Sequence, residues 1–437
     1  MAVTEETSTD ALLDELRGWL EENWDPELTL AEWWGRLGES GWCAPTLPIG
    51  AYGKGLSRSD ANKVGKTIAE FGAVGAPGGL GLLLAAPTIA THGTQEQIDL
   101  YVKDIVTGQQ AWCQLFSEPG AGSDLAGLST KAELDGEEWI VTGQKVWTSL
   151  GQTADMGMLI ARTNPDAPKH QGITWMACDM HQDAVELRPL IEMTGHAMFN
   201  EVFLTEARVP DSAVIGGVNN GWAATNTTLA NERAGLGAGG GSGGSGLTPG
   251  TIGNMLDKRA GDYAPEPGTG KSKPGGPRQR AGSSMMEDLA KMVGKNNDPV
   301  IRQDLVRLHI MNRLGQMNTD RLKAAKMSGK DIPGMANISK LAMSDLVRLN
   351  RDLGLRLVGP AGTLHGYTPE QTAALNEATG NPILPAITGG ALYAQAPPIY
   401  GGTDQIQKNI IGERVLGLPK EPGDFKTTPF SELPKNA

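Results

Sequence analysis

Metal-binding and disulfide-forming residues are scarce in this chain, which has six histidines and three cysteines among 437 residues. Cys43, Cys113 and Cys178 are far apart and form no CxxC pair, so the sequence predicts neither a disulfide framework nor a zinc site. The histidines show no HxxxH or HExxH spacing, which is evidence against a metal centre. We therefore expect no bound metal and a reducing compartment such as the cytoplasm.

The chain also lacks long runs of basic residues and long runs of apolar residues. No block of basic residues interrupts the chain, whose formal net charge is −12, so nucleic acid is not expected as a partner. No apolar run reaches the roughly 18 residues of a membrane span, and the N-terminus is acidic where a signal peptide would be basic. These features predict a cytosolic protein. At roughly 150 residues per domain, the length predicts two or three domains.

Hydrophobic periodicity divides the chain into three parts. At first the apolar residues recur at helical spacing, and Thr94 and Gln97 form a capping box for one helix. The period then changes to two, and Asp135-Gly136 between apolar stretches is a hairpin signal, before the helical period returns. We predict a helical domain over residues 1–111, a β domain over 112–221 and a second helical domain over 222–437.

The second helical domain is interrupted at about residues 236–282. This stretch consists mainly of glycine, serine, proline and basic or polar residues, and Gly239 to Gly246 contains only glycine and serine. Such a composition cannot bury a hydrophobic core. We therefore predict a flexible Gly/Pro-rich insertion, with a linker at its start and a mobile loop after it.

The stretch FSEPGAGSDLAGL, from Phe116 to Leu128, places glycines, serines and carboxylates between apolar flanks. Glycine allows backbone N–H groups to approach a ligand closely, and the hydroxyls of Ser117 and Ser123 offer short polar contacts. An ordinary surface turn would have the same composition. The sequence that follows this stretch favours a binding loop.

Several motifs accompany this stretch. They are Phe116-Ser-Glu-Pro-Gly-Ala-Gly-Ser-Asp124, Thr130-Lys-Ala, Asp135-Gly136, Gly143-Gln-Lys145, Trp147, Asn231-Glu-Arg233 and Ile399-Tyr-Gly-Gly-Thr-Asp-Gln-Ile-Gln-Lys408. In their residues and spacing they resemble the acyl-CoA dehydrogenase family, over most of residues 9–235 and 298–419. The resemblance implies an α+β fold with an N-terminal α-helical domain, a central β-barrel-like domain and a C-terminal four-helix-bundle-like domain.

The resemblance also implies FAD as the cofactor. An indole beside the isoalloxazine gives flat apolar cover, and hydroxyl or amide donors reach the polar edge of the ring. By resemblance, the FAD contacts are Leu115, Phe116, Ser117, Gly122, Ser123, Trp147, Thr148, Ser149, Gly402, Thr403 and Gln405. Outside this context, Trp147 would be expected in the core more often than against a cofactor.

The turn from Gly401 to Asp404 opens a helix, where backbone N–H groups favour an anion such as the pyrophosphate of the cofactor. Asp404 as a simple helix cap is compatible with the same residues. For the substrate, the resemblance implies contacts from Ser123, to the CoA pantetheine, and from Arg233, near the pocket. The aspartate that usually precedes this arginine by three residues is Ala230 here.

Acyl-CoA dehydrogenation removes an α proton with a carboxylate, so the reaction needs a base. In most of the family this base is the glutamate of an IYEGT motif, and Gly401 takes its place here. Counting back from Met292, Glu287 falls where a branch typified by isovaleryl-CoA dehydrogenase has its glutamate, and Asp288 is the alternative. Both residues would equally suit the solvated face of an amphipathic helix. A buried base should have a raised pKa.

The implied function is the α,β-desaturation of an acyl-CoA thioester in fatty acid or lipid metabolism, with electrons passed to an electron-transfer flavoprotein. Family members are usually dimers of dimers, which implies a homotetramer or an α2β2 heterotetramer. Because Gly401 carries no carboxylate, two alternatives stay open. In the first, the chain is a catalytically silent or partner subunit of a heteromeric acyl-CoA dehydrogenase. In the second, it is a flavin-dependent monooxygenase on the same fold.

Overall fold

The computed structural model describes residues 2–237, 245–268, 283–330, 332–420, 422 and 427–434. The chain divides into two compact units. The first consists of residues 1–190, 198–276 and 423–437, and the second of residues 191–197 and 277–422. Among the described residues, no helix is long and apolar enough to cross a membrane, and no cluster of His, Cys, Asp or Glu side chains could hold a metal ion.

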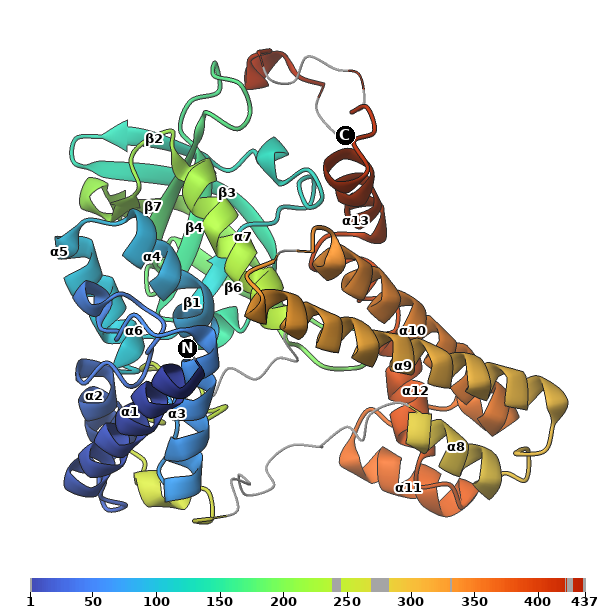
Figure 1. Cartoon of the computed structure of the whole chain (residues 1–437). Coiled ribbons are helices and arrows are strands. Elements are labelled where there is room, and N and C mark those ends of the chain that lie inside the picture. Colours follow the sequence, from blue (N-terminus) through green and yellow to red (C-terminus); the bar gives the residue numbers. More distant parts are fainter. Residues whose placement is uncertain are drawn as a thin grey trace. The chain divides into compact units, whose positions relative to one another are not determined.

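The first unit begins with helices, as the sequence predicts (Figure 1). They are α1 (Ala2–Asn23), α2 (Leu30–Glu39), α3 (Arg58–Phe71), α4 (Ala86–His92), α5 (Gln95–Gln97) and α6 (Lys103–Val106). Thr94 and Gln97 cap α5 reciprocally, so the predicted capping box is confirmed. On α2, Trp33 and Trp34 are fully buried and donate hydrogen bonds from their indoles to backbone carbonyls. These two rings anchor the helical core.

A mixed β-sheet follows the helices (Figure 1). Among the described residues its strands are β1 (Trp112–Leu115), β2 (Lys131–Asp135), β3 (Glu138–Ser149), β4 (Met156–Arg162), β5 (Ile173–Asp179), β6 (Val185–Leu190), β7 (Phe199–Pro210) and β8 (Val214–Ile215). Their order is β6-β7-β3-β2-β4-β5-β8, with β1 parallel to β4. The predicted hairpin is confirmed, because β2 and β3 pair antiparallel around Gly136, whose φ of +66° suits glycine.

Helix α7 (Gly221–Gly237) packs against α4 and β5 within the first unit. The hydroxyls of Thr228 on α7 and Thr88 on α4 lie 2.9 Å apart in a buried position. A Cβ atom on Gly221 would lie 2.3 Å from the backbone nitrogen of Trp175, so only glycine permits this approach to β5. The helical period that returns at residue 221 therefore begins inside the first compact unit.

Residues 245–268 pack against the N-terminal helices. The backbone N–H of Leu30 donates to the carbonyl of Lys258 at 2.8 Å, and Ala260 is fully buried. The prediction of a flexible insertion over residues 236–282 does not hold for this segment, because its apolar residues Leu247, Leu256 and Ala260 pack in or against the core of the first unit and its backbone is hydrogen-bonded to the N-terminal part of the chain. Residues 236 and 237 form the end of helix α7 (Gly221–Gly237), and the rest of the predicted linker and loop, residues 238–244 and 269–282, lies outside the described residues.

The second unit is helical, which confirms the predicted C-terminal helices. Its helices are α8 (Ser283–Met292), α9 (Pro299–Met327), α10 (Met335–Val358), α11 (Pro369–Thr379), α12 (Leu384–Tyr393) and α13 (Asp404–Ile410). Four of them, α8, α9, α10 and α12, share a core. The core residues are Met286, Leu289, Ala290, Ile301, Leu308, Leu353, Leu357 and Ile387.

Candidate functional site

The predicted binding loop begins where β1 ends. Leu115 and Phe116 are buried, with exposed fractions of 0% and 4%. Glu118 and Ala121 exchange two backbone hydrogen bonds of 3.0 Å, which close a tight turn, and the loop ends in the 3₁₀ turn Leu125–Gly127. Leu115 and Phe116 therefore offer a ligand their backbone rather than their side chains.

Glu118 and Lys145 form a buried ion pair beneath this loop. The Nζ atom of Lys145 lies 2.9 Å from Oε1 of Glu118 and also donates to the carbonyl of Phe116 at 3.1 Å. The Glu118 carboxylate accepts further hydrogen bonds from the backbone N–H groups of Ser129 and Thr130, at 2.7 and 2.9 Å. Burial lowers the pKa of Lys145, while Glu118 acts against this shift. Burial acts to raise the pKa of Glu118, but Lys145 and the hydrogen bonds bring it below its usual value.

Trp147 is turned outward by a bulge in β3. The register with β7 shifts between Lys145 and Thr148, and Trp147 has a φ of +62°, in the left-handed region. Its indole is 61% exposed and lies edge-on to Phe199, with the ring centroids 5.9 Å apart. Because a non-glycine residue in this region is strained, the exposed aromatic ring indicates a functional position. Trp147 offers a ligand a flat apolar face.

The other predicted FAD residues of the first unit lie on the binding loop and in β3. The carbonyl of Ser117 accepts a hydrogen bond of 2.9 Å from the backbone of β3, one residue before the indole. Ser149 is partly buried, whereas Gly122 and Ser123 are exposed, and a Cβ atom on Gly122 would meet no atom within 4 Å. Thr148 is buried, and in the described part of the chain its Oγ1 atom has no hydrogen-bond partner.

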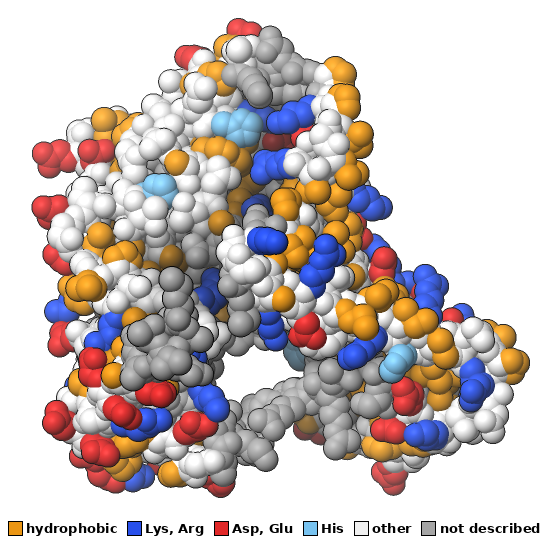
Figure 2. Space-filling model, viewed as in Figure 1, with side chains coloured by type: hydrophobic (Ala, Val, Ile, Leu, Met, Phe, Trp, Pro, Cys, Tyr) orange, Lys and Arg blue, Asp and Glu red, His pale blue; other side chains and the backbone are white. Residues whose placement is uncertain are grey.

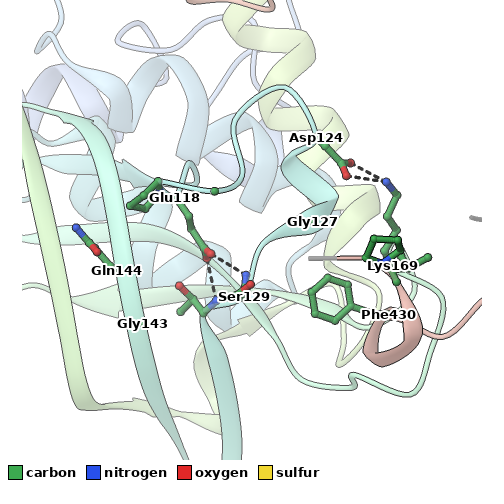
Figure 3. A pocket seen from close by; sticks show the side chains of 13 residues that line it. Glu118, Asp124, Gly127, Ser129, Gly143, Gln144, Lys169 and Phe430 are labelled. Atoms are coloured by element: carbon green, nitrogen blue, oxygen red, sulfur yellow. Dashed lines mark hydrogen bonds and ion pairs between the residues drawn. The ribbon is translucent and has the colours of Figure 1, made fainter. Parts of the chain in front are cut away.

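A cavity of about 650 Å³ lies beside the loop (Figure 3). Its lining comes from the loop, from β3, from the β4–β5 turn and from the C-terminal segment: Glu118, Pro119, Gly120, Asp124, Gly127, Ser129, Thr130, Gly143, Gln144, Lys169, Phe430, Leu433 and Pro434. The Nζ atom of Lys169 lies 2.8 Å from both carboxylate oxygens of Asp124. Figure 3 marks this ion pair with dashed lines. This pair joins the β4–β5 turn to the loop.

Arg162, the last residue of β4, is buried next to this cavity. Its Cζ atom lies 3.8 Å from the centroid of the Phe430 ring. Burial lowers the pKa of Arg162 to about 10, although Glu118 and Asp124 act against the shift, so the guanidinium stays charged at neutral pH. Phe430 belongs to the segment that the family resemblance leaves uncovered, and no local pattern marks it as part of the site.

Glu232 on α7 is a further carboxylate of the first unit. It is partly buried, and burial raises its pKa, although Gln114 and Arg233 act against the shift. The Nε2 atom of Gln114, on β1 just before the loop, lies 3.5 Å from Oε2 of Glu232. Arg233, the predicted substrate residue, is exposed. Glu232 is the middle residue of the motif Asn231-Glu-Arg233, from which the sequence predicts only Arg233 as a site residue.

The second unit holds the predicted residues of the terminal motif. Thr403 is the N-cap of α13, and its side chain accepts a hydrogen bond from a backbone N–H group. Asp404 does not cap this helix, contrary to the simpler expectation. Its buried carboxylate pairs with Lys340 at 3.1 Å and Arg348 at 2.7 Å, both on α10. Gly402 precedes the cap with a φ of +82°, which suits glycine.

Glu287 and Asp288, the predicted base and its alternative, lie on the exposed side of α8. Asp288 is 3.8 Å from Lys291, and both side chains are well exposed. Gln405, a predicted FAD contact, is also exposed. Within the second unit, neither carboxylate has the burial that is expected of a general base.

Comparison with known proteins identifies the class. The family model for the N-terminal domain of acyl-CoA dehydrogenase matches residues 5–109, and the model for the middle domain matches residues 113–206. Acyl-CoA dehydrogenase IpdE1 of Mycobacterium tuberculosis is 30% identical over 425 residues, which are 93% of this chain and 97% of that relative. Acyl-CoA dehydrogenase FadE34 of the same organism is 36% identical over 389 residues. These are 88% of this chain but 46% of FadE34, so the chain spans about half the length of that relative.

Among solved structures, the ChsE4-ChsE5 complex from Mycobacterium tuberculosis has the same fold. It matches with a TM-score of 0.62 at 24% identity, over 95% of this chain and 98% of that chain. The N-terminal helices, the mixed sheet and the C-terminal helices described above agree with that fold. This chain belongs to the acyl-CoA dehydrogenase family and is an enzyme of that kind.

FAD is the cofactor of this family, and the residues of the first unit fit it. The exposed, strained Trp147 can cover one face of a planar ring, and the open position at Gly122 lets a ligand approach the backbone. The buried Oγ1 atom of Thr148, which has no partner in the described part of the chain, is a further donor within this bulge. Ser117 and Ser123 supply hydroxyl groups on the loop.

Proposed function

We propose that this chain catalyses the FAD-dependent α,β-desaturation of an acyl-CoA thioester. The observation that carries the proposal is the position of Glu232, which lies 3.5 Å from Gln114 on the strand that leads into the binding loop. A partly buried carboxylate is thus supplied from α7, within reach of the strand that leads to Ser117. It compensates for the missing side chain at Gly401.

Glu232 is the proposed general base, in preference to Glu287 and Asp288. Its carboxylate takes the proton from the α carbon, which the neighbouring thioester carbonyl makes acidic. Burial raises the pKa of Glu232, and a higher pKa makes a carboxylate a stronger base. When bound, FAD supplies the acceptor for the hydride that leaves the β carbon. The side chain of Glu287, in contrast, is exposed on α8.

The remaining contacts follow the family motifs. Ser123 and Arg233 are the proposed substrate residues, and both are exposed, as residues that meet a large soluble thioester should be. Gly402, Thr403 and Gln405 are the proposed contacts to the FAD pyrophosphate, because the start of α13 presents backbone N–H groups that suit an anion. An electron-transfer flavoprotein is the proposed electron acceptor. The three described cysteines are all free and buried, in keeping with a cytoplasmic location.

An oligomer is part of the proposal, as a homotetramer or an α2β2 heterotetramer. Helix α9 buries Ile301 and Leu308 on one side, and on the other it exposes a stripe of apolar residues at helical spacing. The stripe consists of Val306, Ile310, Leu314 and Met317, each at least 50% exposed. Figure 2 shows hydrophobic side chains along this helix. Apolar stripes of this kind on a long helix favour packing against another helix.

Anaerobic titration of the purified protein with acyl-CoA thioesters tests the function. Bound yellow FAD that bleaches on addition of a thioester supports the dehydrogenase. FAD that is bound and never bleached would instead favour the monooxygenase or the partner-subunit alternative. Protein without FAD would favour a structural subunit, and native mass spectrometry of the same sample reports whether the assembly contains one kind of chain.

A further inference from the structure

The C-terminal segment of the chain returns to the first unit. Pro429 pairs with Pro168 in an isolated antiparallel bridge on the β4–β5 turn. The backbone N–H of Phe430 donates to the carbonyl of Ala167 at 3.0 Å, and the next residue donates to the same turn at 2.9 Å. Phe430 then begins a single 3₁₀ turn, Phe430–Glu432, that places its ring beside the cavity (Figure 3). The bridge with its Phe430 hydrogen bond, the second hydrogen bond and the 3₁₀ turn together determine where this ring lies.

The ring covers a guanidinium that holds the binding loop. Arg162 is 4% exposed, and its Cζ atom lies 3.8 Å from the Phe430 centroid. Its Nη2 atom donates to the carbonyls of Ala126 and Leu128, at 2.6 and 3.3 Å, at the end of the loop. Its Nη1 atom donates to the carbonyl of Lys169 at 2.7 Å. One side chain therefore connects the binding loop, the β4–β5 turn and the C-terminal segment.

A second connection runs parallel to the first. The backbone carbonyl of Lys169 accepts a hydrogen bond from Arg162, and the side chain of Lys169 forms an ion pair with Asp124 of the loop. The loop is thus attached to the β4–β5 turn on both sides of Leu125–Gly127. Because the Phe430 ring keeps water away from the guanidinium, it strengthens the hydrogen bonds from Arg162 to the loop carbonyls.

We propose that Arg162 and Phe430 are positioning residues for the loop from Ser117 to Leu128, and hence for its contacts with the flavin and the thioester. The inference rests on the proposed function only for what the loop binds. The attachment of the loop itself follows from the hydrogen bonds of Arg162. Two residues that belong to none of the family motifs thereby set the geometry of the binding loop.

Hydrogen exchange followed by mass spectrometry tests the attachment on the full-length chain, without any substrate. We expect Phe430→Ala to speed exchange of the backbone amides in residues 117–128 by about tenfold, the effect of losing a desolvated cation–π contact. Phe430→Tyr keeps an aromatic face and should exchange like the wild type. Ser431→Ala, which retains the ring, is the matched control, and peptides of α2 should be unchanged in every variant.

Faster exchange confined to residues 427–434, with an unchanged loop, would overturn the proposal. If Phe430→Ala does not fold, Arg162→Lys makes the same test, since lysine keeps the charge and loses the forked donors that reach Ala126 and Leu128. In the active enzyme, Phe430→Ala should raise KM for the thioester several-fold with kcat unchanged at saturation, whereas a ring that merely stabilises the fold would lower Tm and leave KM unchanged. Absence of any dehydrogenase activity would contradict the proposed function, and loop exchange would still decide this inference.

Discussion

The Nζ atom of Lys145 lies 2.9 Å from the Oε1 atom of Glu118, with 0% of the lysine side chain and 8% of the glutamate side chain exposed. Both residues belong to the family motifs, one in β3 and one in the binding loop. A buried pair is not by itself a source of net stability, because both charges lose their hydration. Its effect here is to attach the loop to the strand that carries Trp147.

Removing one member of the Glu118–Lys145 pair should destabilise the folded chain. Lys145→Met leaves Glu118 charged and buried without its partner, and we expect the free energy of unfolding to fall by about 3–5 kcal/mol in urea denaturation. Lys131→Met is the control, because the pair of Lys131 with Glu133 has a similar distance, 2.8 Å, but side chains that are 56% and 67% exposed. An equal, small effect of both substitutions would show that the buried pair does not anchor the loop.

Glu232→Gln should abolish bleaching of the flavin by acyl-CoA while FAD stays bound, because an amide cannot accept the α proton. Glu287→Gln, on the exposed side of α8, is the matched control and should retain activity. If the control loses activity and Glu232→Gln retains it, the base is Glu287 after all.

The same substitution makes a prediction about stability and pH. The folded-state pKa of Glu232 is raised, so the folded protein holds this proton more tightly than the unfolded chain. Stability is therefore lost as the pH rises through the raised pKa. Glu232→Gln removes this loss, and we expect a higher Tm than the wild type at about pH 8 and no difference at about pH 4. A Tm difference that does not depend on pH would contradict the assigned environment of Glu232.

Gly401 occupies a backbone position that disfavours side chains, with a φ of +63°. Gly401→Ala should lower the free energy of unfolding by about 1 kcal/mol, and Gly401→Glu should be strained in the same way. Gly315→Ala gives the contrast, since Gly315 lies in α9 with no atom within 4 Å of an added Cβ. It should stabilise the chain by about 0.5–1 kcal/mol in the same denaturation assay. If Gly401→Ala stabilises the chain as Gly315→Ala does, the backbone turn at Gly401 changes its conformation to accept a side chain.

Trp147→Ala should weaken FAD binding by about tenfold, because the exposed indole supplies the flat contact to the ring. Trp147→Phe retains an aromatic face and should lose less. Leu134→Ala, which removes a side chain of similar exposure, 56%, from β2, is the control and should bind FAD like the wild type. Equilibrium titration of the apoprotein with FAD measures all three. An unchanged affinity of Trp147→Ala for FAD would show that the indole does not contact the flavin.

Local features of this chain follow from its sequence alone. The capping box at Thr94 and the hairpin at Gly136 involve residues within a few positions of each other, so short-range spacing and backbone preference determine them. The α, β, α order follows from periodicity for the same reason. The cofactor follows from the motif around Ser117 to Ser123 together with Trp147, because the family match depends on residue type and spacing.

Long-range contacts decided the rest. Burial of Glu232 depends on the packing of α7 against α4, β5 and residues Gly81–Ala85, and the covering of Arg162 depends on a residue 268 positions later, Phe430. Residues 245–268 have a linker composition, yet the N-terminal helices supply their hydrogen-bond partners. In each case the free energy comes from groups that are distant in sequence, and only the folded chain brings them together. Residue types and their spacing are therefore enough to identify the family and its flavin, whereas the environment of Glu232 and the attachment of the binding loop arise only from the packing of distant segments.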